Sequence, residues 1–467
     1  MLSKLVFLNR CYWPDTEATG QLLTDLCEHL GRCGHEVHVV CGQPNSPRAN
    51  TPFLPHGVEV RNGVSIHRLT HARFPKRVPA GRLLNLVSFT HAAQRYLKQT
   101  RLQADVFVSE TDPFLLPAVV AKHARRFNAH FVAYLQDIYP DVAEAIGKAK
   151  PGLVTNQIRS RLRNAYQSAA KVIVLGSCMR DRLASPPWSL DADKIEIIPN
   201  WADCGAIRPI PHTDNPLRQQ WNLNDKFVVM HSGNMGLTQR LDFLIDATND
   251  PAWPENAVLL LVGDGAAKQQ LQHQSAHPPP NPPTDKVSRF GASHGCDPSS
   301  NHHPPSGRVE RSEGRAEPQN QQPEKLKANS DQLIAKNKTT PRVQFLPYQP
   351  REQLAESLSA ADLHVISMHE NITGCLCPSK LYGILAAGRP VLAIAPDQTD
   401  LARTVHEQKI GWVCEPGNAK RIAESVAKAA TSQIAPIGQT ARRLAETNYD
   451  QSVAVAAFEK QITNLNN

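Results

Sequence analysis

Two turns in the second half of the chain carry residue types that hold phosphate groups. His231–Gly236 follows the apolar run Phe227–Met230 and precedes a helical pattern, and its glycines would let backbone N–H groups approach a phosphate. Pro378-Ser379-Lys380 opens a second helical run, where Ser379 could bond free N–H groups and Lys380 would add positive charge. Together the two turns would suit a diphosphate. The alternatives are a tight turn at the first, and a simple helix cap beside a solvated lysine at the second.

Carboxylates occupy similar places in the first half of the chain. Glu17 lies between the first apolar run and a helical pattern that Thr19 or Gly20 could open, and Asp137 follows the apolar run Phe131–Leu135. Sheets of α/β proteins place ligands beyond the carboxyl ends of their strands. Either carboxylate could therefore activate a hydroxyl as a base or bind sugar hydroxyls. The alternative is that these residues cap helices and form turns.

The elements that must position these residues follow a repeated strand–helix rhythm. Short apolar runs separated by helical patterns predict parallel βαβ units and an α/β fold. The rhythm stops in the loop-like segment 200–211 and then restarts, which predicts two Rossmann-like domains joined near residue 205. We expect an N-terminal domain over residues 1–205, a C-terminal domain over 206–440, and a helix within 441–467 that packs back on the N-terminal domain. The expected strands are Leu5–Leu8, Val37–Cys41, Val106–Ser109, Phe131–Leu135, Val172–Leu175, Val228–His231, Val258–Val262, Val343–Leu346, Leu363–Ile366 and Val391–Ile394.

One segment, from about Gln274 to Pro341, breaks this rhythm. It is rich in Pro, Ser, Asn, Gln, His and charged residues, and it has almost no apolar periodicity. Such a composition cannot bury enough apolar surface to offset the entropy of ordering. We therefore expect a disordered insertion (274–341) in a surface loop of the C-terminal domain, whose histidines reflect composition rather than a metal site.

Charge and cysteine content narrow the class of protein. The chain has 467 residues, with 51 Lys and Arg against 43 Asp and Glu, and a net charge of +8. This charge permits contact with phosphates or an anionic membrane, but no nucleic-acid-binding signature accompanies it. The ten cysteines form no C-x-x-C pair, which suits a reducing cytosol. Because we find neither a signal peptide nor an apolar run long enough to span a bilayer, we expect a cytoplasmic protein without a nucleic-acid partner.

Residues 71–101 combine basic and apolar side chains. Such a stretch could dock on an anionic membrane surface. The alternative is an ordinary helix with a solvated face and a mobile basic loop. The basic residues are His71, Arg73, Lys76, Arg77 and Arg82, and the apolar residues are Phe74, Leu83, Leu84, Leu86, Val87 and Phe89.

The order and spacing of several motifs resemble glycosyltransferase family 4, which has the two-domain GT-B fold. The closer resemblance is to the subgroup of colanic acid and O-antigen (L-fucosamine-type) glycosyltransferases, and it covers nearly the whole chain except the insertion. The motifs are Tyr12-Trp13-Pro14 with the Glu17–Gly20 loop, Gly34-His35-Glu36-Val37, Gln136-Asp137-Ile138-Tyr139-Pro140, Ile198-Pro199-Asn200-Trp201, Ser232–Gly236, Val262-Gly263-Asp264-Gly265, Phe345-Leu346-Pro347-Tyr348, and Pro378-Ser379-Lys380 with Ala386–Val391.

The resemblance implies two Rossmann-like domains that face a central cleft. It also implies retaining transfer of a sugar from a nucleotide-diphosphate sugar, UDP- or GDP-linked, with no metal and no other cofactor. Asp137, Glu370 and Lys380 would be the catalytic residues. The donor would bind the C-terminal domain through Gly233, Asn234, Gly236, Arg240, Gly263, Leu346, Tyr348, Pro378, Ser379 and Lys380, and the acceptor would bind the N-terminal domain through Glu17, Thr19, Gly20 and Asp137.

The chain departs from the family pattern at two places. Many members have an E-x7-E motif where this chain has Cys375 and Gly383, and a Lys where it has Gln239 and Arg240. Lys380 or Arg240 would then supply the missing positive charge. We expect an enzyme, cytoplasmic or peripheral at the inner face of the cell membrane, that extends a lipid-linked glycan in polysaccharide or lipopolysaccharide biosynthesis. A nucleotide-sugar epimerase of the same fold and a non-catalytic nucleotide-sugar-binding protein are the alternatives.

Overall fold

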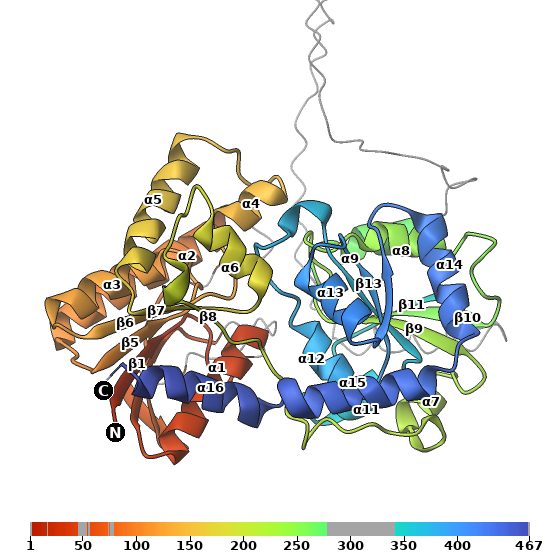
Figure 1. Ribbon diagram of the computed structural model, residues 1–467, viewed down its shortest axis with the longest axis horizontal. Coiled ribbons are helices and arrows are strands. Elements are labelled where there is room, and N and C mark those ends of the chain that lie inside the picture. Colours follow the sequence, from red (N-terminus) through yellow and green to blue (C-terminus); the bar gives the residue numbers. More distant parts are fainter. Residues whose placement is uncertain are drawn as a thin grey trace, which may run out of the picture. The chain divides into compact units, whose positions relative to one another are not determined.

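The computed structural model describes residues 2–15, 17–44, 54, 57–72, 74, 79–277 and 341–465 (Figure 1). Residues 278–340 of the expected insertion lie outside this set, as do Arg73, Lys76, Arg77 and the side chain of Arg82. The expected start of the insertion at Gln274 is too early, because helix α9 spans Lys268–Ala276. The Gln274 side chain donates to the Asp246 carboxylate at 2.7 Å, which fixes this end of the helix.

The first sheet has eight strands in the order β3-β4-β2-β1-β5-β6-β7-β8, and every neighbouring pair except β3–β4 is parallel. Helices cover both faces of a parallel sheet, so its central strands are apolar throughout, and Leu5–Leu8 are all buried. The strands are β1 (Lys4–Leu8), β2 (Glu36–Cys41), β3 (Gly57–Arg61), β4 (Val64–Arg68), β5 (Val106–Ser109), β6 (His130–Tyr134), β7 (Lys171–Val174) and β8 (Ile195–Ile197).

Helices α1, α2, α3, α4 and α6 each follow a strand of this sheet and so begin at its carboxyl edge, and α5 follows α4 (Figure 1, red to yellow). Helix α3 packs against both α2 and α5. Helix α16 also packs on this sheet, since Phe458 is fully buried against the rings of Phe7 and Tyr134. The longer helices are α1 (Ala18–Arg32), α2 (Pro79–Thr100), α3 (Leu116–Arg126), α5 (Leu153–Gln167) and α16 (Gln451–Thr463), and the shorter ones are α4 (Asp141–Ala145) and α6 (Ser177–Ala184).

The second sheet has six parallel strands in the order β11-β10-β9-β12-β13-β14, which is the Rossmann order 3-2-1-4-5-6 (Figure 1, green to blue). The strands are β9 (Phe227–Ser232), β10 (Ala257–Val262), β11 (Val343–Leu346), β12 (Leu363–Ser367), β13 (Val391–Ile394) and β14 (Gly411–Cys414). The helices here are α7 (Pro216–Gln220), α8 (Leu241–Ala247), α9, α11 (Leu354–Ser359), α12 (Lys380–Ala386), α13 (Asp400–Glu407), α14 (Ala419–Ala430) and α15 (Ile434–Asn448). Among the described residues, no helix is long and apolar enough to cross a membrane.

Candidate active site

Lys380 is the first residue of α12, and its side chain reaches the turn that follows β9. Its Nζ donates to His231 Nε2 at 2.9 Å and to the Asn234 carbonyl oxygen at 3.1 Å. The side chain is partly buried rather than solvated, and among the described residues no carboxylate forms an ion pair with it. The third ammonium N–H has no partner within this part of the chain. The cation is therefore available to an anion that comes from outside the protein.

Burial changes the acid–base properties of this lysine and its histidine neighbour. Loss of hydration lowers the pKa of Lys380 to about 7, because no nearby carboxylate compensates for it. Burial also lowers the pKa of His231 well below its usual value, and the charge of Lys380 adds to the effect. Neutral His231 can donate from Nδ1 to the Val365 carbonyl oxygen, 3.3 Å away, and accept from Lys380 at Nε2. A phosphate bound here would raise the pKa of Lys380 again.

Glycines allow the turns after β9 and β10 to approach this lysine closely. Gly233 has a φ of 119°, and a Cβ at this position would lie 2.8 Å from Lys380 Cε. Gly263 has a φ of 140°, and a Cβ there would collide with the Gly233 carbonyl oxygen. Both positions thus require glycine for conformation and for space. Within the same turn, the Gly236 N–H already donates to Gln239 Oε1 at 3.1 Å.

Leu346 and Tyr348 lie beside these turns at the end of β11. The Leu346 carbonyl oxygen accepts the Gly263 N–H at 2.9 Å, which joins the turn after β10 to the end of the neighbouring strand. The Tyr348 side chain is 54% exposed. Backbone groups of this strand end are therefore engaged in the sheet, while the aromatic ring of Tyr348 offers an exposed apolar face.

Arg240, the other cation expected near the phosphates, is paired with neighbouring carboxylates. Its guanidinium donates to both carboxylate oxygens of Asp242 at 3.1 Å and lies 3.6 Å from Glu370 Oε1. It also lies over the Phe243 ring, 4.4 Å from the centroid. These partners balance the charge of Arg240, so Lys380 is the more available cation, and the phosphate-binding role of Arg240 stays a prediction. Glu370, expected to be catalytic, is exposed and belongs to the same ion pair.

A second group of charged residues lies beyond the carboxyl ends of β1 and β5. Arg10 donates to Asp112 at 2.8 Å and to Glu17 at 3.4 Å. The thiol of Cys11 and the carboxylate oxygens of Glu17 and Asp112 lie within 4.8 Å of one another, a spacing that could hold a metal ion. Because Arg10 already lies against both carboxylates, the arrangement is better suited to hydrogen bonds with neutral hydroxyl groups than to a second cation.

Asp137 and Glu110 are two further carboxyl groups at this edge, beyond β6 and β5. Burial, with a contribution from the charge of Asp112, raises the pKa of Asp137 to about 6. Glu110 is 1% exposed, and neither of its carboxylate oxygens has a hydrogen-bond partner among the described residues. Burial, together with Asp112 and Asp137, raises the pKa of Glu110 well above its usual value. The site thus combines a carboxyl group whose pKa is about 6 with a second one whose pKa is raised well above its usual value.

Backbone contacts tie the loop that carries Asp137 to the segment that leads to Lys380. Asp137 forms an isolated antiparallel bridge with Leu376, and the Ile138 N–H donates to the Cys375 carbonyl oxygen at 2.8 Å. Arg182 adds a side-chain donor to the Thr373 carbonyl oxygen at 2.8 Å. The structure therefore connects the expected base and the expected phosphate-binding cation through a short stretch of chain.

Two expectations about helix starts need correction. Helix α1 begins at Ala18 with Glu17 at the N-cap, so Thr19 and Gly20 lie within its first turn and do not open it. Ser379 is the N-cap residue of α12, but its side chain makes no hydrogen bond to the first turn. The hydrogen-bonding role assigned to Ser379 is therefore absent. Pro378 precedes it and, like Ser379, is partly buried.

The sequence reasoning missed Arg10, Glu110, Asp112 and the pairing of His231 with Lys380. Glu110 and Asp112 directly follow the expected strand Val106–Ser109, so the rule that selected Asp137 would also have selected them. His231 and Lys380 are 149 positions apart in the chain, so no local sequence pattern predicts their contact.

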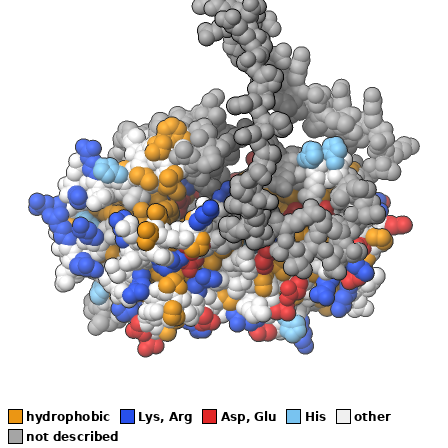
Figure 2. Space-filling model, turned by 90° about the horizontal axis from the view of Figure 1, so that it is seen from above, with side chains coloured by type: hydrophobic (Ala, Val, Ile, Leu, Met, Phe, Trp, Pro, Cys, Tyr) orange, Lys and Arg blue, Asp and Glu red, His pale blue; other side chains and the backbone are white. Residues whose placement is uncertain are grey.

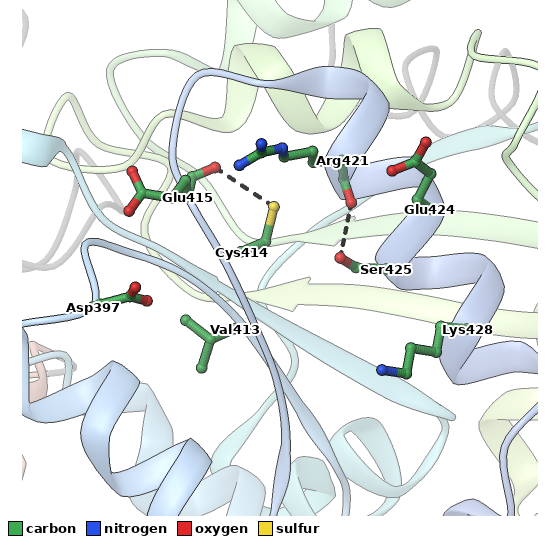
Figure 3. Close-up of a pocket in the computed structure, with 8 residues that line it drawn as sticks. All are labelled: Asp397, Val413, Cys414, Glu415, Arg421, Glu424, Ser425 and Lys428. Atoms are coloured by element: carbon green, nitrogen blue, oxygen red, sulfur yellow. Dashed lines mark hydrogen bonds between the residues drawn. The ribbon is translucent and has the colours of Figure 1, made fainter.

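A separate hollow of about 390 Å³ lies at the end of β14, against α14 (Figure 3). Both acidic and basic side chains line it, and none of the residues expected from the sequence is among them. The lining residues are Asp397, Val413, Cys414, Glu415, Arg421, Glu424, Ser425 and Lys428. This hollow is therefore distinct from the candidate active site.

Two Rossmann-like sheets define a protein of the GT-B fold. One carries glycine turns and a lysine with no ion pair among the described residues, and the other carries clustered carboxyl groups, which is typical of a glycosyltransferase. Family comparison agrees. Residues 18–201 match the glycosyl transferase 4-like domain and residues 322–451 match glycosyl transferases group 1. The chain belongs to this family of glycosyltransferases, which supports an enzyme rather than the epimerase or binding-protein alternatives.

Known proteins similar to the chain have low sequence identity but high coverage. The putative colanic acid biosynthesis glycosyl transferase WcaI of Escherichia coli is 22% identical over 97% of both chains. The probable glycosyltransferase WbjE of Pseudomonas aeruginosa is 20% identical over 76% of this chain and 74% of its own. Anabaena HepE, solved with UDP and glucose, has a TM-score of 0.63 at 15% identity and covers 99% of this chain and 100% of its own. This structural likeness supports the fold.

Proposed function

We propose that this glycosyltransferase moves a sugar, with retention of anomeric configuration, from a nucleotide-diphosphate sugar to a lipid-linked glycan in cell-surface polysaccharide biosynthesis. The observation that carries the donor assignment is Lys380, a partly buried ammonium with an unused N–H and no carboxylate partner among the described residues. The bound UDP of Anabaena HepE and the name of WcaI support the nucleotide sugar and the polysaccharide role.

In this proposal the diphosphate binds against Lys380 and the turn at Gly233. As the glycosidic bond to the diphosphate breaks, negative charge grows on the leaving phosphate oxygen. Lys380 stabilises that charge in a site where hydration is already reduced, so its effect is larger than in bulk water. The reaction then needs no metal ion, and its donor is a UDP- or GDP-linked sugar.

The acceptor binds beyond the first sheet, where Glu17, Asp112 and Asp137 can accept hydrogen bonds from sugar hydroxyls. The raised pKa of Asp137, about 6, leaves it mainly ionised at neutral pH but basic enough to take a proton from an attacking hydroxyl. Asp137 is a proposed base on this argument, and Glu17 with Asp112 would orient the glycan.

Exposed apolar side chains support a lipid-linked acceptor. Leu83, Leu84 and Val87 near the start of α2 are each about half exposed, whereas Phe89 is fully buried in the core. At the start of α5, Leu153 is 89% exposed and Val154 71% exposed. Helix α2 directly follows β4, and α5 follows β6 after the short helix α4, so both belong to connections that leave the carboxyl edge of the sheet, where the acceptor carboxylates lie.

Positive charge accompanies these apolar residues. Lys148 and Lys150 are exposed in the turn between α4 and α5, directly before Leu153. Figure 2, which views the side at the top of Figure 1, shows hydrophobic side chains exposed beside Lys and Arg side chains. Such a surface suits an anionic bilayer and a peripheral position at the inner face of the membrane.

A donor screen and a pair of variants test the assignment of the reaction. We expect one or more UDP- or GDP-sugars to raise the melting temperature of the purified chain, because a ligand that binds only the folded state stabilises it. NMR of the product should show the donor's anomeric configuration retained. Lys380→Ala should strongly reduce the thermal shift and transfer, whereas Lys428→Ala, in the separate hollow, should leave both unchanged. Full transfer by Lys380→Ala, or an inverted product, would refute the proposal.

Liposome co-sedimentation tests the membrane contact. Replacing Leu83, Leu84 and Val87 by Ser should reduce binding to anionic liposomes at both low and high salt. Replacing the basic set Arg73, Lys76, Arg77 and Arg82 by Gln should reduce binding only at low salt, since surface charge is screened. Val58→Ser and Val60→Ser, at exposed sites on the edge strand β3, serve as the matched control. Wild-type protein that stays in the supernatant at both salt concentrations contradicts docking.

A further inference from the structure

We propose a zinc-binding site between α1 and α16, formed by His29, Cys33 and Glu459. His29 and Cys33 are four residues apart at the end of α1, a spacing that puts both side chains on one face of the helix. Glu459 projects from α16. The three ligand atoms, one imidazole nitrogen, one thiol sulfur and one carboxylate oxygen, all lie within 4.8 Å of one another.

The distances between these atoms agree with a tetrahedral zinc ion. Zinc binds His nitrogen and Asp or Glu oxygen at about 2.0–2.2 Å and Cys sulfur at about 2.3 Å, so its ligand atoms are roughly 3.3–3.6 Å apart. Here His29 Nε2 lies 3.4 Å from Cys33 Sγ and 3.7 Å from Glu459 Oε2. The three side chains would therefore need only small movements to bind the ion, and water would complete the tetrahedron.

A buried histidine orients the carboxylate of this group. His35 Nε2 lies 3.4 Å from Glu459 Oε1, the oxygen that does not face His29, and the His35 side chain is 3% exposed. The Ser3 N–H donates to His35 Nδ1 at 3.2 Å, so Nε2 is the ring nitrogen that faces Glu459. Second-sphere partners at this position fix the orientation of a metal-binding side chain.

The site is remote from the candidate active site. Cys33 follows the last residue of α1, and His35 and Ser3 directly precede β2 and β1, so the group lies at the amino edge of the first sheet. The carboxylates Glu17, Asp112 and Asp137 lie at the carboxyl edge. A zinc ion here has a structural role, because it links α16 to α1. When zinc binds, it replaces the proton of the Cys33 thiol, and that proton is released to solvent.

Cobalt(II) is the probe that identifies these ligands without an activity assay. The full-length chain carries His294, Cys296, His302 and His303 outside the described residues. The titrations therefore use a background in which Cys296 is Ser and these three histidines are Asn. We expect one equivalent of cobalt to give the near-ultraviolet thiolate-to-cobalt band and the visible bands of a tetrahedral site. Zinc should bleach both and raise the melting temperature.

Single substitutions decide whether the proposed residues hold the ion. Cys33→Ser should remove the thiolate band, and His29→Gln or Glu459→Gln should weaken zinc binding at least 100-fold; all three positions are accessible enough to change without loss of the fold. His35→Asn should weaken it 10- to 100-fold, the usual effect of losing a second-sphere partner. Cys178→Ser is the control and should bind as the parent does. A band that persists in Cys33→Ser, the absence of any band, or a thermal shift by zinc that is unchanged in Glu459→Gln would overturn the proposal.

Discussion

Replacing Lys380 by Met should stabilise the free enzyme and at the same time weaken donor binding. In the folded chain the pKa of Lys380 is about 7, whereas in the unfolded chain it is about 10.4. Between these values the unfolded state binds more protons than the folded state, so the stability of the wild type rises with pH across that window. Below pH 7 the lysine is charged in both the folded and the unfolded state, so the free energy of unfolding is lowered by the full cost of burying the ammonium. Met fills a similar volume without this cost.

The magnitude follows from the two pKa values. Linkage gives a destabilisation by the titrating lysine of up to ~4 kcal/mol at pH 7 and ~2 kcal/mol at pH 9. The melting temperature of Lys380→Met should therefore exceed that of the wild type by more at pH 7 than at pH 9. Lys428→Met, at an outlying position beside the separate hollow, controls for the general effect of exchanging a lysine for methionine.

Donor binding should change in the opposite direction. Loss of one charge-assisted hydrogen bond to a phosphate costs about 1.5–3 kcal/mol, which is roughly a 10- to 150-fold increase in Kd. In the wild type the Kd should also rise with pH above 7, because the neutral amine gains population and the sugar diphosphate itself does not titrate there. Calorimetry of both proteins from pH 6 to pH 9 measures this. A stability difference that does not change with pH, together with an unchanged donor Kd, would refute the assignment of Lys380.

Three further predictions address other parts of the molecule. Gly233→Ala should weaken donor binding, measured by thermal shift with the donor, because its Cβ would displace the lysine side chain; Gly147→Ala, another glycine with positive φ but with open space around it, should not. Asp137→Asn should lower kcat by 100-fold or more with an unchanged donor Kd, and wild-type transfer should fall as pH drops through about 6. Burial and His38 lower the pKa of His67 to about 4, so its contribution to stability is complete above pH 6.5 and is lost between pH 6.5 and 4. Acid titrations of the wild type and His67→Phe should show this loss only in the wild type.

Local patterns predict most strands of this fold because a parallel sheet buries both faces of each strand. Apolar runs such as Val258–Val262 coincide with β10 for that reason. The hairpin β3–β4 was missed, although Asn62-Gly63 at its turn is a strong hairpin signal, with φ of 46° and 80°. Its outer strand, β3, is largely exposed, so it lacks the apolar run on which the other predictions rested.

The candidate site could be predicted only in part, for a physical reason. Residue type and position after a strand select Asp137 and Lys380, since chain direction alone brings strand ends to one edge. Which groups each of these side chains pairs with depends on packing between distant segments, so it cannot be predicted from residue type and position in the sequence. Arg240 and Lys380 both carry positive charge beside the same turn. Arg240 is paired with Asp242 and Glu370, whereas the partners of Lys380 among the described residues are His231 and a backbone carbonyl.

The residues that replace the family's E-x7-E motif fit this arrangement. Cys375 is fully buried, and its carbonyl oxygen accepts the Ile138 N–H, in the joint that connects the loop of Asp137 with the segment of Lys380. A glutamate at that position would place a carboxylate in an apolar cluster, at a cost of several kcal/mol unless it were protonated. A side chain at Gly383 would start against Leu358 and Ile207. These two positions therefore contribute to the joint and to the helix packing, and neither offers a carboxylate to a donor ribose.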